Sequence, residues 1–484
     1  MSFKTVVAAA LVLLVAGGSV VYYYAGQEPG PLVKIEKPAA IGGGPVVLDV
    51  TVDALGSRLR RLEVSVQQQG RVFRMFSLDS PGGARFTQET ADRIRVTQES
   101  PSSTLTGLRD GPAQLVVTAS RDVLYGVRRA ETVEKRDLPA RLTPPKLAVV
   151  SRHHYVNLGG AEMAVYRVTP ADAASGVQVG NRYYPGYPAA GAAGPATAGA
   201  PPVDPALRVA FFALLHDDDI TTPIRLVAKD PAGNAATAEF AYRAFTSSFA
   251  KRRLPVDDAF FRKVVPPILE ATPSFKLPVD TPEERLDAFL KINGDLRRAN
   301  EATFTRMGRA KAEAVFADYR TYVYDGRDID RQVHLGADLA STRGAAITAS
   351  NTGMVIFTGF LGIYGNCVVL DHGMGVQSLY AHLSSVTVEV GDRINRGEII
   401  GRSGATGLAG GDHLHFTVLV AGRPVNPVEW WDPHWIADRI DRKLVDAGIM
   451  SVSAATKAPV VKAPAKKKAP ARGKAKPAAP KKKR

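Results

Sequence analysis

The sequence contains very little cysteine, since Cys367 is the only one in 484 residues. An intramolecular disulfide is therefore excluded, which is compatible with export but does not select it. Cys367 precedes the apolar run Val368–Leu370, so we interpret it as a small buried core residue rather than a nucleophile. Because 45% of the residues are hydrophobic, the chain can build real cores, and its length predicts about three or four domains.

Charged residues are absent from residues 5–25, a mostly apolar stretch. A transmembrane helix needs about 20 such residues. Lys4 precedes the stretch, and Tyr22–Tyr24 could anchor its far end at a membrane interface. We therefore predict a transmembrane anchor. A signal peptide cleaved near Ala16–Ser19 is the alternative, and in either case the rest of the chain is exported.

Acidic residues are absent from the tail, residues 456–484, which consists largely of lysine, alanine and proline and carries most of the net charge of +15. Such a composition cannot bury a core and predicts disorder. The tail is a candidate for binding anionic wall or membrane polymers, and a solubilising extension explains it equally well. Nucleic-acid binding, the usual alternative for a basic tail, is not expected in an exported chain.

Two regions, residues 45–142 and 145–245, predict β-structure. Short runs rich in β-formers, such as Val46–Val52, alternate with turn signals, such as Asp230–Asn234. This pattern predicts two immunoglobulin-like β-sandwich modules. The preceding residues 28–44 are rich in proline and glycine and predict a linker.

The second β region contains two polar clusters that we do not interpret as sites. His153 and His154 are adjacent, so in a strand they face opposite sides and are best explained as surface residues. The acidic run Asp217–Asp219 lacks the ligand spacing of a calcium loop. A solvated acidic turn explains it.

Residues 250–317 predict a helical segment between the β regions and the C-terminal region. Thr281, Pro282 and Glu284 form a helix start, with threonine as the N-cap and glutamate three residues later. We expect one or two helices from Arg285 to Ala314. The aromatic residues that follow, up to Tyr324, predict a packed strand, with a role in lining a substrate groove as the alternative.

Four histidines and two aspartates gather in three short motifs: HLGAD (His334–Asp338), YAHL (Tyr380–Leu383) and DHLHF (Asp412–Phe416). These side chains bind transition metals and transfer protons. Two histidines and one aspartate would hold a zinc ion and leave one position for water. A lone H-x-H pair is weak support for a metal site, but three motifs within about eighty residues strengthen it considerably.

The runs HLGADLAS, GNCVVLDHG, LYAHLSSV, DHLHFTV and GRPVNP resemble the LytM/lysostaphin-like zinc metallopeptidases, which cleave peptidoglycan cross-bridges. The resemblance implies a compact antiparallel β fold with the site in a groove. It also implies that one Zn²⁺ is held by His334, Asp338 and His415. His413 is then the general base, and His382 stabilises the transition state. Thr417 stands where the family often has glutamate, but it is not one of these five positions.

The complete prediction is a multidomain, mainly β protein of the bacterial cell envelope, anchored in the inner membrane with periplasmic domains. Residues 318–435 are predicted to be a zinc endopeptidase that hydrolyses peptide cross-links of peptidoglycan. The main alternative is a catalytically silent wall-binding protein that activates an amidase, and a third is a metal-binding structural module. We also hypothesise that the β modules or the helical segment cover the groove until a partner releases them.

Overall fold

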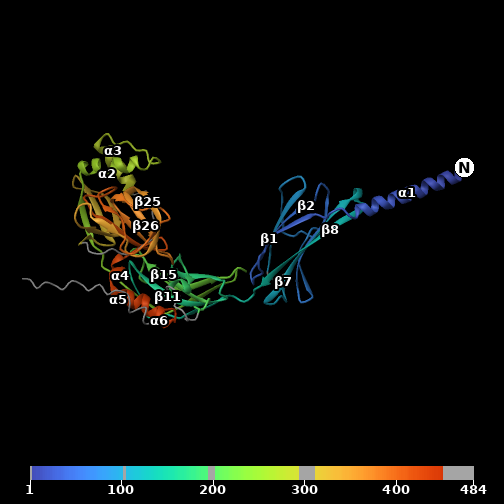
Figure 1. Ribbon diagram of the computed structural model, residues 1–484, viewed down its shortest axis with the longest axis horizontal. Helices are drawn as coiled ribbons and strands as arrows, with labels where there is room; N and C mark the ends of the chain where they lie inside the picture. Colours follow the sequence, from blue (N-terminus) through green and yellow to red (C-terminus); the bar gives the residue numbers. More distant parts are fainter. Residues whose placement is uncertain (1–2, 102–104, 194–201, 294–310, 451–484) are drawn as a thin grey trace, which may run out of the picture.

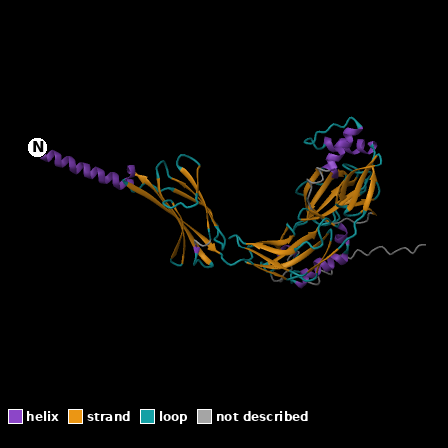
Figure 2. Ribbon diagram, turned by 180° about the vertical axis from the view of Figure 1, so that it is seen from behind, coloured by secondary structure: helices purple, strands orange, loops and turns teal. Residues whose placement is uncertain are grey.

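The computed structural model describes residues 3–101, 105–193, 202–293 and 311–450 (Figure 1). Strands form most of this part of the chain, and the helices are few (Figure 2). The mainly β character expected from the sequence is therefore confirmed. The tail that was predicted to be disordered, residues 456–484, lies outside the described residues.

Helix α1 (Phe3–Ala25) extends away from the first β region (Figure 1). It covers the uncharged stretch in which the membrane anchor was predicted. Among the residues that the structure describes, no helix is long and apolar enough to cross a membrane. The predicted anchor over residues 5–25 is therefore not supported.

The first β region consists of two four-stranded sheets, with strand orders β1-β2-β6-β5 and β4-β3-β7-β8. Alternate residues of β2 and β3 enter a common core that both sheets share. The linker predicted over residues 28–44 is wrong for β1, because this stretch pairs with β2 and its Val33 and Ile35 pack against the same core. The strands are β1 (Leu32–Lys37), β2 (Val46–Asp53), β3 (Leu59–Gln68), β4 (Arg71–Ser77), β5 (Arg85–Gln88), β6 (Arg93–Ser100), β7 (Gly111–Val123) and β8 (Arg128–Ala140).

The second β region also has two four-stranded sheets, with orders β14-β15-β11-β9 and β13-β12-β16-β17, and a parallel pair, β10 and β18. His153 is exposed as predicted, but His154 is buried. The prediction of a surface position is therefore wrong for His154. Both nitrogens of its ring find partners in the interior, since Nε2 lies 2.8 Å from the Ser151 hydroxyl and Nδ1 lies 3.0 Å from the Ala241 carbonyl. The strands are β9 (Lys146–Val149), β10 (His154–Asn157), β11 (Gly160–Thr169), β12 (Ala174–Val179), β13 (Arg182–Pro185), β14 (Tyr187–Pro188), β15 (Leu207–Leu214), β16 (Ile224–Lys229), β17 (Ala235–Glu239) and β18 (Tyr242–Phe245).

The segment that was predicted to be helical contains β19 (Lys251–Pro255), α2 (Asp258–Glu270), α3 (Pro282–Lys291) and β20 (Lys311–Ala314). The predicted helix start is confirmed, since Thr281 and Glu284 form a capping box at α3. The prediction of a helix reaching Ala314 is wrong for β20, because this stretch pairs with β23 (Ala337–Ala340) at the edge of a sheet. Part of the predicted helix, residues 294–310, lies outside the described residues.

The C-terminal region is built on a sheet with strand order β20-β23-β31-β27-β26-β25-β29, with β32 paired to β31. Two three-stranded sheets, β24-β30-β28 and β19-β21-β22, complete it. Its strands are antiparallel except for the β19–β21 pair. Their bounds are β21 (Asp318–Tyr324), β22 (Arg327–His334), β23 (Ala337–Ala340), β24 (Ala346–Thr348), β25 (Gly353–Phe360), β26 (Asn366–Asp371), β27 (Val376–Ala381), β28 (Leu383–Val386), β29 (Arg393–Ile394), β30 (Ile399–Ser403), β31 (Leu414–Val420) and β32 (Arg423–Val425).

One hydrophobic core joins the second β region to the C-terminal region. After β32, the chain forms α4 (Pro427–Trp431), α5 (Pro433–Ile436) and α6 (Arg442–Asp446). The rings of Trp430 in α4 and Phe211 in β15 lie 5.6 Å apart. These helices therefore connect the two regions through shared side-chain packing.

Candidate metal centre

Three strands bring the HLGAD and DHLHF motifs together. Strand β22 ends at His334, and a short turn returns the chain into β23, which carries Asp338. Strand β23 pairs with β31 so that Asp338 lies directly opposite His415. The turn must be glycine at position 336, because a Cβ there would lie 2.6 Å from His415 Nε2. Backbone pairing therefore places these three side chains in one cluster.

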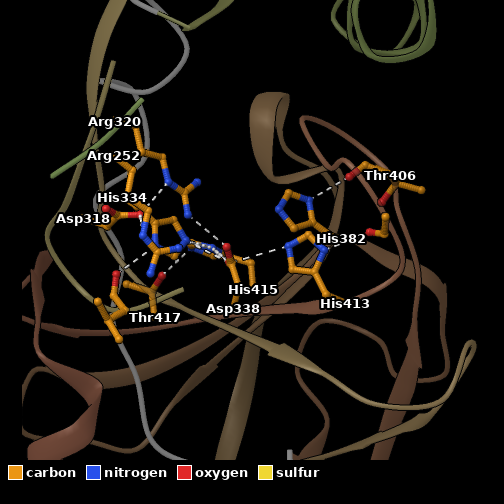
Figure 3. A network of polar contacts seen from close by, with 12 residues as sticks. Arg252, Asp318, Arg320, His334, Asp338, His382, Thr406, His413, His415 and Thr417 are labelled. Carbon is orange, nitrogen blue, oxygen red and sulfur yellow. Dashed lines mark hydrogen bonds and ion pairs between the residues drawn. The ribbon is translucent and has the colours of Figure 1, made fainter. Parts of the chain in front are cut away.

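The cluster has three atoms that converge on one point (Figure 3). His334 Nε2 lies 2.8 Å from Asp338 Oδ1 and 2.9 Å from His415 Nδ1, and the latter two atoms are 2.9 Å apart. Three ligands of a tetrahedral zinc ion at about 2.0–2.2 Å would be about 3.3–3.6 Å apart. The donor atoms therefore fit a zinc ion once they separate by several tenths of an ångström.

The outer nitrogens of the two histidines fix which atoms face inward. His334 Nδ1 donates to the Val315 carbonyl over 3.1 Å, so its Nε2 presents a lone pair to the cluster. His415 Nε2 lies 2.9 Å from the Thr417 hydroxyl, and when it donates there its Nδ1 also presents a lone pair. Two nitrogen lone pairs and a carboxylate oxygen then face one another, an arrangement that a cation satisfies.

His382 and His413 lie beside this cluster, with their rings 4.8 Å apart (Figure 3). His382 has a left-handed backbone, with φ of 61°, at the junction of β27 and β28, and its Nδ1 donates to the Thr406 carbonyl over 2.7 Å. His413 Nδ1 donates to the Gly411 carbonyl over 2.9 Å, and its Nε2 lies 3.6 Å from Asp338 Oδ1. The structure thus brings together all five residues that the sequence singled out.

The electrostatics of the cluster favour an anionic Asp338 and neutral rings at His382 and His415. Burial acts to raise the pKa of Asp338, but His334, His413 and His415 outweigh it and hold this pKa well below its usual value. Burial lowers the pKa of His415 to about 4. Burial, with smaller contributions from His413 and His415, also lowers the pKa of His382 well below its usual value. Neutral imidazoles can coordinate a cation or accept a proton.

The remaining motif aspartate, Asp412, is not part of the cluster. Its carboxylate accepts hydrogen bonds from the Ser403 hydroxyl, at 2.6 Å, and from the Gly344 amide, at 3.1 Å. The predicted aromatic strand packs as expected, since Tyr322 is buried in the core formed with α2 and α3. The hydroxyl of Tyr319 contacts His216 of the second β region at 3.1 Å.

Sequence reasoning missed two charged residues next to the cluster, Asp318 and Arg320. Arg320 Nη2 donates to Asp338 Oδ2 over 3.1 Å, and Arg320 Nε donates to Asp318 Oδ2 over 3.2 Å. The signal that could have identified them is their spacing, because residues two apart in a strand share a face.

The region that contains the candidate metal centre is similar to known proteins. Residues 332–427 match the profile of Peptidase family M23. The chain is 43% identical over 97 residues to the DD-carboxypeptidase/endopeptidase Mpg of Neisseria meningitidis. The matched segment covers 20% of this chain and 22% of the relative. It is 41% identical over 96 residues to the peptidoglycan DD-endopeptidase ShyA of Vibrio cholerae, again covering 20% and 22%. The chain thus spans about a fifth of the length of these curated relatives.

Solved structures give matches in the same part of the chain. The catalytic domain of lysostaphin from Staphylococcus simulans is 30% identical, covers 25% of this chain and 90% of that chain, and has a TM-score of 0.22. A TM-score this low carries no structural argument, so the assignment depends on the family match and on the curated relatives. The family match and the curated relatives confirm the resemblance seen in the sequence. Residues 332–427 of this chain are therefore a peptidase family M23 domain.

Proposed function

We propose that this chain is a zinc-dependent endopeptidase that hydrolyses peptide cross-links of peptidoglycan in the bacterial envelope. The observation that supports the proposal most directly is the convergence of His334 Nε2, Asp338 Oδ1 and His415 Nδ1 within 2.9 Å of one another. The names of the relatives, a DD-carboxypeptidase/endopeptidase and a peptidoglycan DD-endopeptidase, support the substrate class.

His334, Asp338 and His415 would hold the zinc ion. When bound, zinc would polarise the scissile carbonyl and lower the pKa of a water molecule towards neutrality. Asp338 would ligate through Oδ1, since its Oδ2 accepts the hydrogen bond from Arg320. The partners of the two histidines keep their lone pairs aimed inward, so little reorganisation is needed when the ion binds.

His413 and His382 would handle the proton of the attacking water. Each donates from Nδ1 to a backbone carbonyl, so each neutral ring has its lone pair on Nε2. His413 takes the proton, since its Nε2 lies 3.6 Å from Asp338 Oδ1, beside the ligand cluster. Because a carbonyl can only accept, His382 donates from Nε2 to an oxyanion only as an imidazolium.

The first experiment is to incubate residues 28–484 with purified sacculi, with and without a zinc chelator, and to identify the released peptides. We expect chelator-sensitive conversion of cross-linked dimers to monomers. His413→Ala and His382→Ala should abolish conversion, whereas the exposed His434→Ala, as the matched control, should not change it. An absence of conversion by the unaltered chain would overturn the proposal.

The intact ligand set weighs against the alternative in which the domain only activates an amidase. The same variants separate the two functions. If His413→Ala stimulates a purified amidase as well as the unaltered chain does, and neither protein converts dimers, the activator function is correct.

A further inference from the structure

The strand that precedes the metal ligands carries charged side chains that the proposed mechanism does not use. In β21, Asp318 and Arg320 lie on the same face, and β21 pairs with β22 so that Asp318 is opposite His334. Asp318 is fully buried. Arg252 in β19 is the register partner of Arg320 and lies 3.6 Å from Asp318 Oδ2. This charged layer therefore lies directly beside the ligand cluster (Figure 3).

Arg320 uses two of its three nitrogens to hold carboxylates. Its Nε is bonded to Asp318 and its Nη2 to Asp338. In the described part of the chain no residue accepts a hydrogen bond from Nη1. Figure 3 shows this end of the guanidinium pointing away from both carboxylates, towards the side on which His382 and His413 lie. Its side chain is 17% exposed. Since the planar fork is fixed at two positions, the remaining donors also have a fixed direction.

The charges of this layer point to an anionic ligand. Asp318 and Asp338 balance Arg252 and Arg320, so the four side chains are neutral as a group before a divalent cation is added. A bound cation would leave an excess of positive charge. A substrate carboxylate beside the reacting amide would offset it, and the guanidinium is the side chain best suited to bind that group.

We propose that Arg320 is a specificity-determining residue whose Nη1 binds a free carboxylate on the substrate residue that supplies the scissile amide nitrogen. The inference rests on the proposed peptidase function. Arg320 touches the ligand Asp338, so a carboxylate bound to Nη1 lies next to the carbonyl under attack. The preferred bond is then an amide whose nitrogen-bearing carbon also carries a carboxylate, as at the C-terminus of a peptide.

A purely positioning role for Arg320 makes different predictions. If Arg320 only orients Asp338, its loss should lower zinc affinity and slow the hydrolysis of every substrate by the same factor. If it binds a substrate carboxylate, its loss should affect only substrates that have this group, mainly through KM. The two roles are separated by a pair of substrates that differ in this one group.

The test uses two synthetic cross-linked dimers that are identical except for a free carboxylate or a primary amide at that carbon. We expect the unaltered zinc-loaded chain to cleave the carboxylate dimer with a kcat/KM about 10- to 100-fold higher. Arg320→Gln, assayed at a saturating zinc concentration, should cleave both dimers at similar rates. Arg320→Lys, which keeps the charge without the fork, should show an intermediate preference. The matched control is Arg331→Gln on the neighbouring strand β22, where the side chain is 79% exposed.

A binding measurement gives a readout that does not depend on turnover. The released product peptide with the free carboxylate is titrated into the unaltered chain and into Arg320→Gln, each with and without zinc. Weaker binding to Arg320→Gln in both states supports the proposal. Equal binding, or equal cleavage of both dimers by the unaltered chain, overturns it. If the unaltered chain cleaves neither dimer, the peptidase function fails, and the titration still decides whether Arg320 binds the carboxylate.

Discussion

Gly336 controls how closely the turn between β22 and β23 approaches His415. A Cβ at position 336 would lie 2.6 Å from His415 Nε2 and 2.7 Å from the Thr417 hydroxyl. We expect Gly336→Ala to displace the His415 ring and to abolish stoichiometric zinc binding, as measured by metal analysis of the purified protein. Gly410→Ala is the control, because a Cβ there meets nothing within 4 Å. Full zinc occupancy in Gly336→Ala would show that the ring can move without loss of the site.

Thr417 shows how a residue outside the family pattern can still serve the site. The sequence marks it only as a departure from a common glutamate, whereas its hydroxyl lies 2.9 Å from His415 Nε2. Replacing the partner of a metal-binding histidine typically lowers metal affinity about 10- to 100-fold. We expect Thr417→Val to show this loss in a chelator competition titration and Thr417→Ser to retain most of the affinity. Equal affinities for all three proteins would contradict the assignment.

The five candidate site residues could be located in the sequence because they lie in three short motifs whose residue types have few other uses together. Arg320 could not be predicted in the same way. Its partner Asp338 is in a different strand, and the contact depends on the pairing of β21 with β22 and of β23 with β31. The spacing of Asp318 and Arg320 indicates only that the two side chains share a face of a strand. Nothing in the local sequence shows that this face meets Asp338. The burial of His154 could not be predicted either, because its Nδ1 contacts the carbonyl of Ala241, which is distant in the sequence.

At the scale of elements, local sequence signals predicted the structure correctly where contacts within the same segment determine it. The capping box of Thr281 and Glu284 is such a signal, and the helix begins where it predicts. The stretch Lys311–Ala314 is different, because its sequence is suited to a helix but its backbone pairs with β23. Pairing with a distant strand overrides the weak intrinsic preference of a short segment.

Helix α6 is attached to the second β region by a buried ion pair. Lys443 Nζ lies 2.6 Å from Glu162 Oε1, and it also donates to the Met163 carbonyl. Lys443→Met leaves the buried Glu162 carboxylate with hydrogen bonds from the Tyr155 and Met163 amides. In the described part of the chain, its one remaining ion-pair partner is then Arg439, at 3.7 Å. We expect a loss of about 3–5 kcal/mol in the free energy of unfolding, measured by urea denaturation.

The control for this pair is Arg442→Met, since Arg442 is 63% exposed and, among the described residues, forms an ion pair only with Asp438. We expect that variant to change the free energy of unfolding by about 0.5 kcal/mol or less. The double variant Lys443→Met with Glu162→Gln should recover part of the loss, because it removes the buried charge that the single variant leaves. No recovery would mean that packing, and not charge, accounts for the loss.

Helix α4 is attached to the same region by Glu429, whose carboxylate accepts hydrogen bonds from Asn157 and from the Ala161 amide. Burial raises the pKa of Glu429 from 4.5 to about 7, although both hydrogen bonds act against the rise. Between these values the folded state binds more protons than the unfolded state. The free energy of unfolding therefore falls as the pH rises from 4.5 through 7, by up to about 3 kcal/mol.

Glu429→Gln removes this titration and keeps a hydrogen-bonding side chain, which Asn157 can accommodate by rotating its amide. We expect the difference in the free energy of unfolding between the variant and the unaltered chain to change by about 3 kcal/mol between pH 4.5 and pH 8. The variant must be compared with the unaltered chain at each pH, because His154 also makes the free energy of unfolding depend on pH. Burial lowers the pKa of His154 to about 4, so its protonation destabilises the folded state as the pH falls below about 6.5. A constant difference would show that Glu429 is ionised throughout.

At the scale of the whole molecule, the hydrophobic core of the M23 domain is continuous with that of the second β region. The core it shares with the second β region includes Phe211, Trp430 and Trp435, and the Glu429 and Lys443 contacts cross the same boundary. Strand β19, which pairs with β21, precedes the domain in the sequence, and α6 follows it. An isolated fragment of residues 320–440 would expose all of these surfaces. The boundaries that the sequence suggests for the peptidase are thus narrower than the folding unit.

The first β region is connected far more weakly. Its described polar contacts with the second region include the Arg141–Asp172 ion pair, at 2.7 Å, and the hydrogen bonds of Asn234 with Gly43 and Arg141. Figure 1 shows it beyond the second β region, away from the M23 domain. It is therefore poorly placed to cover the metal centre, as the hypothesis of a covered groove would require.

We therefore expect residues 145–484 to keep the thermal unfolding transition of the peptidase unit and to hydrolyse a soluble cross-linked dimer within about twofold of residues 28–484, since few contacts are lost. Residues 320–440 should unfold at a much lower temperature or aggregate, because the shared core is cut. Calorimetry and a dimer hydrolysis assay on the three proteins measure both effects. A large rise in activity in residues 145–484 would instead show that the first β region restrains the enzyme, and a stable, active 320–440 fragment would show that the shared core is dispensable.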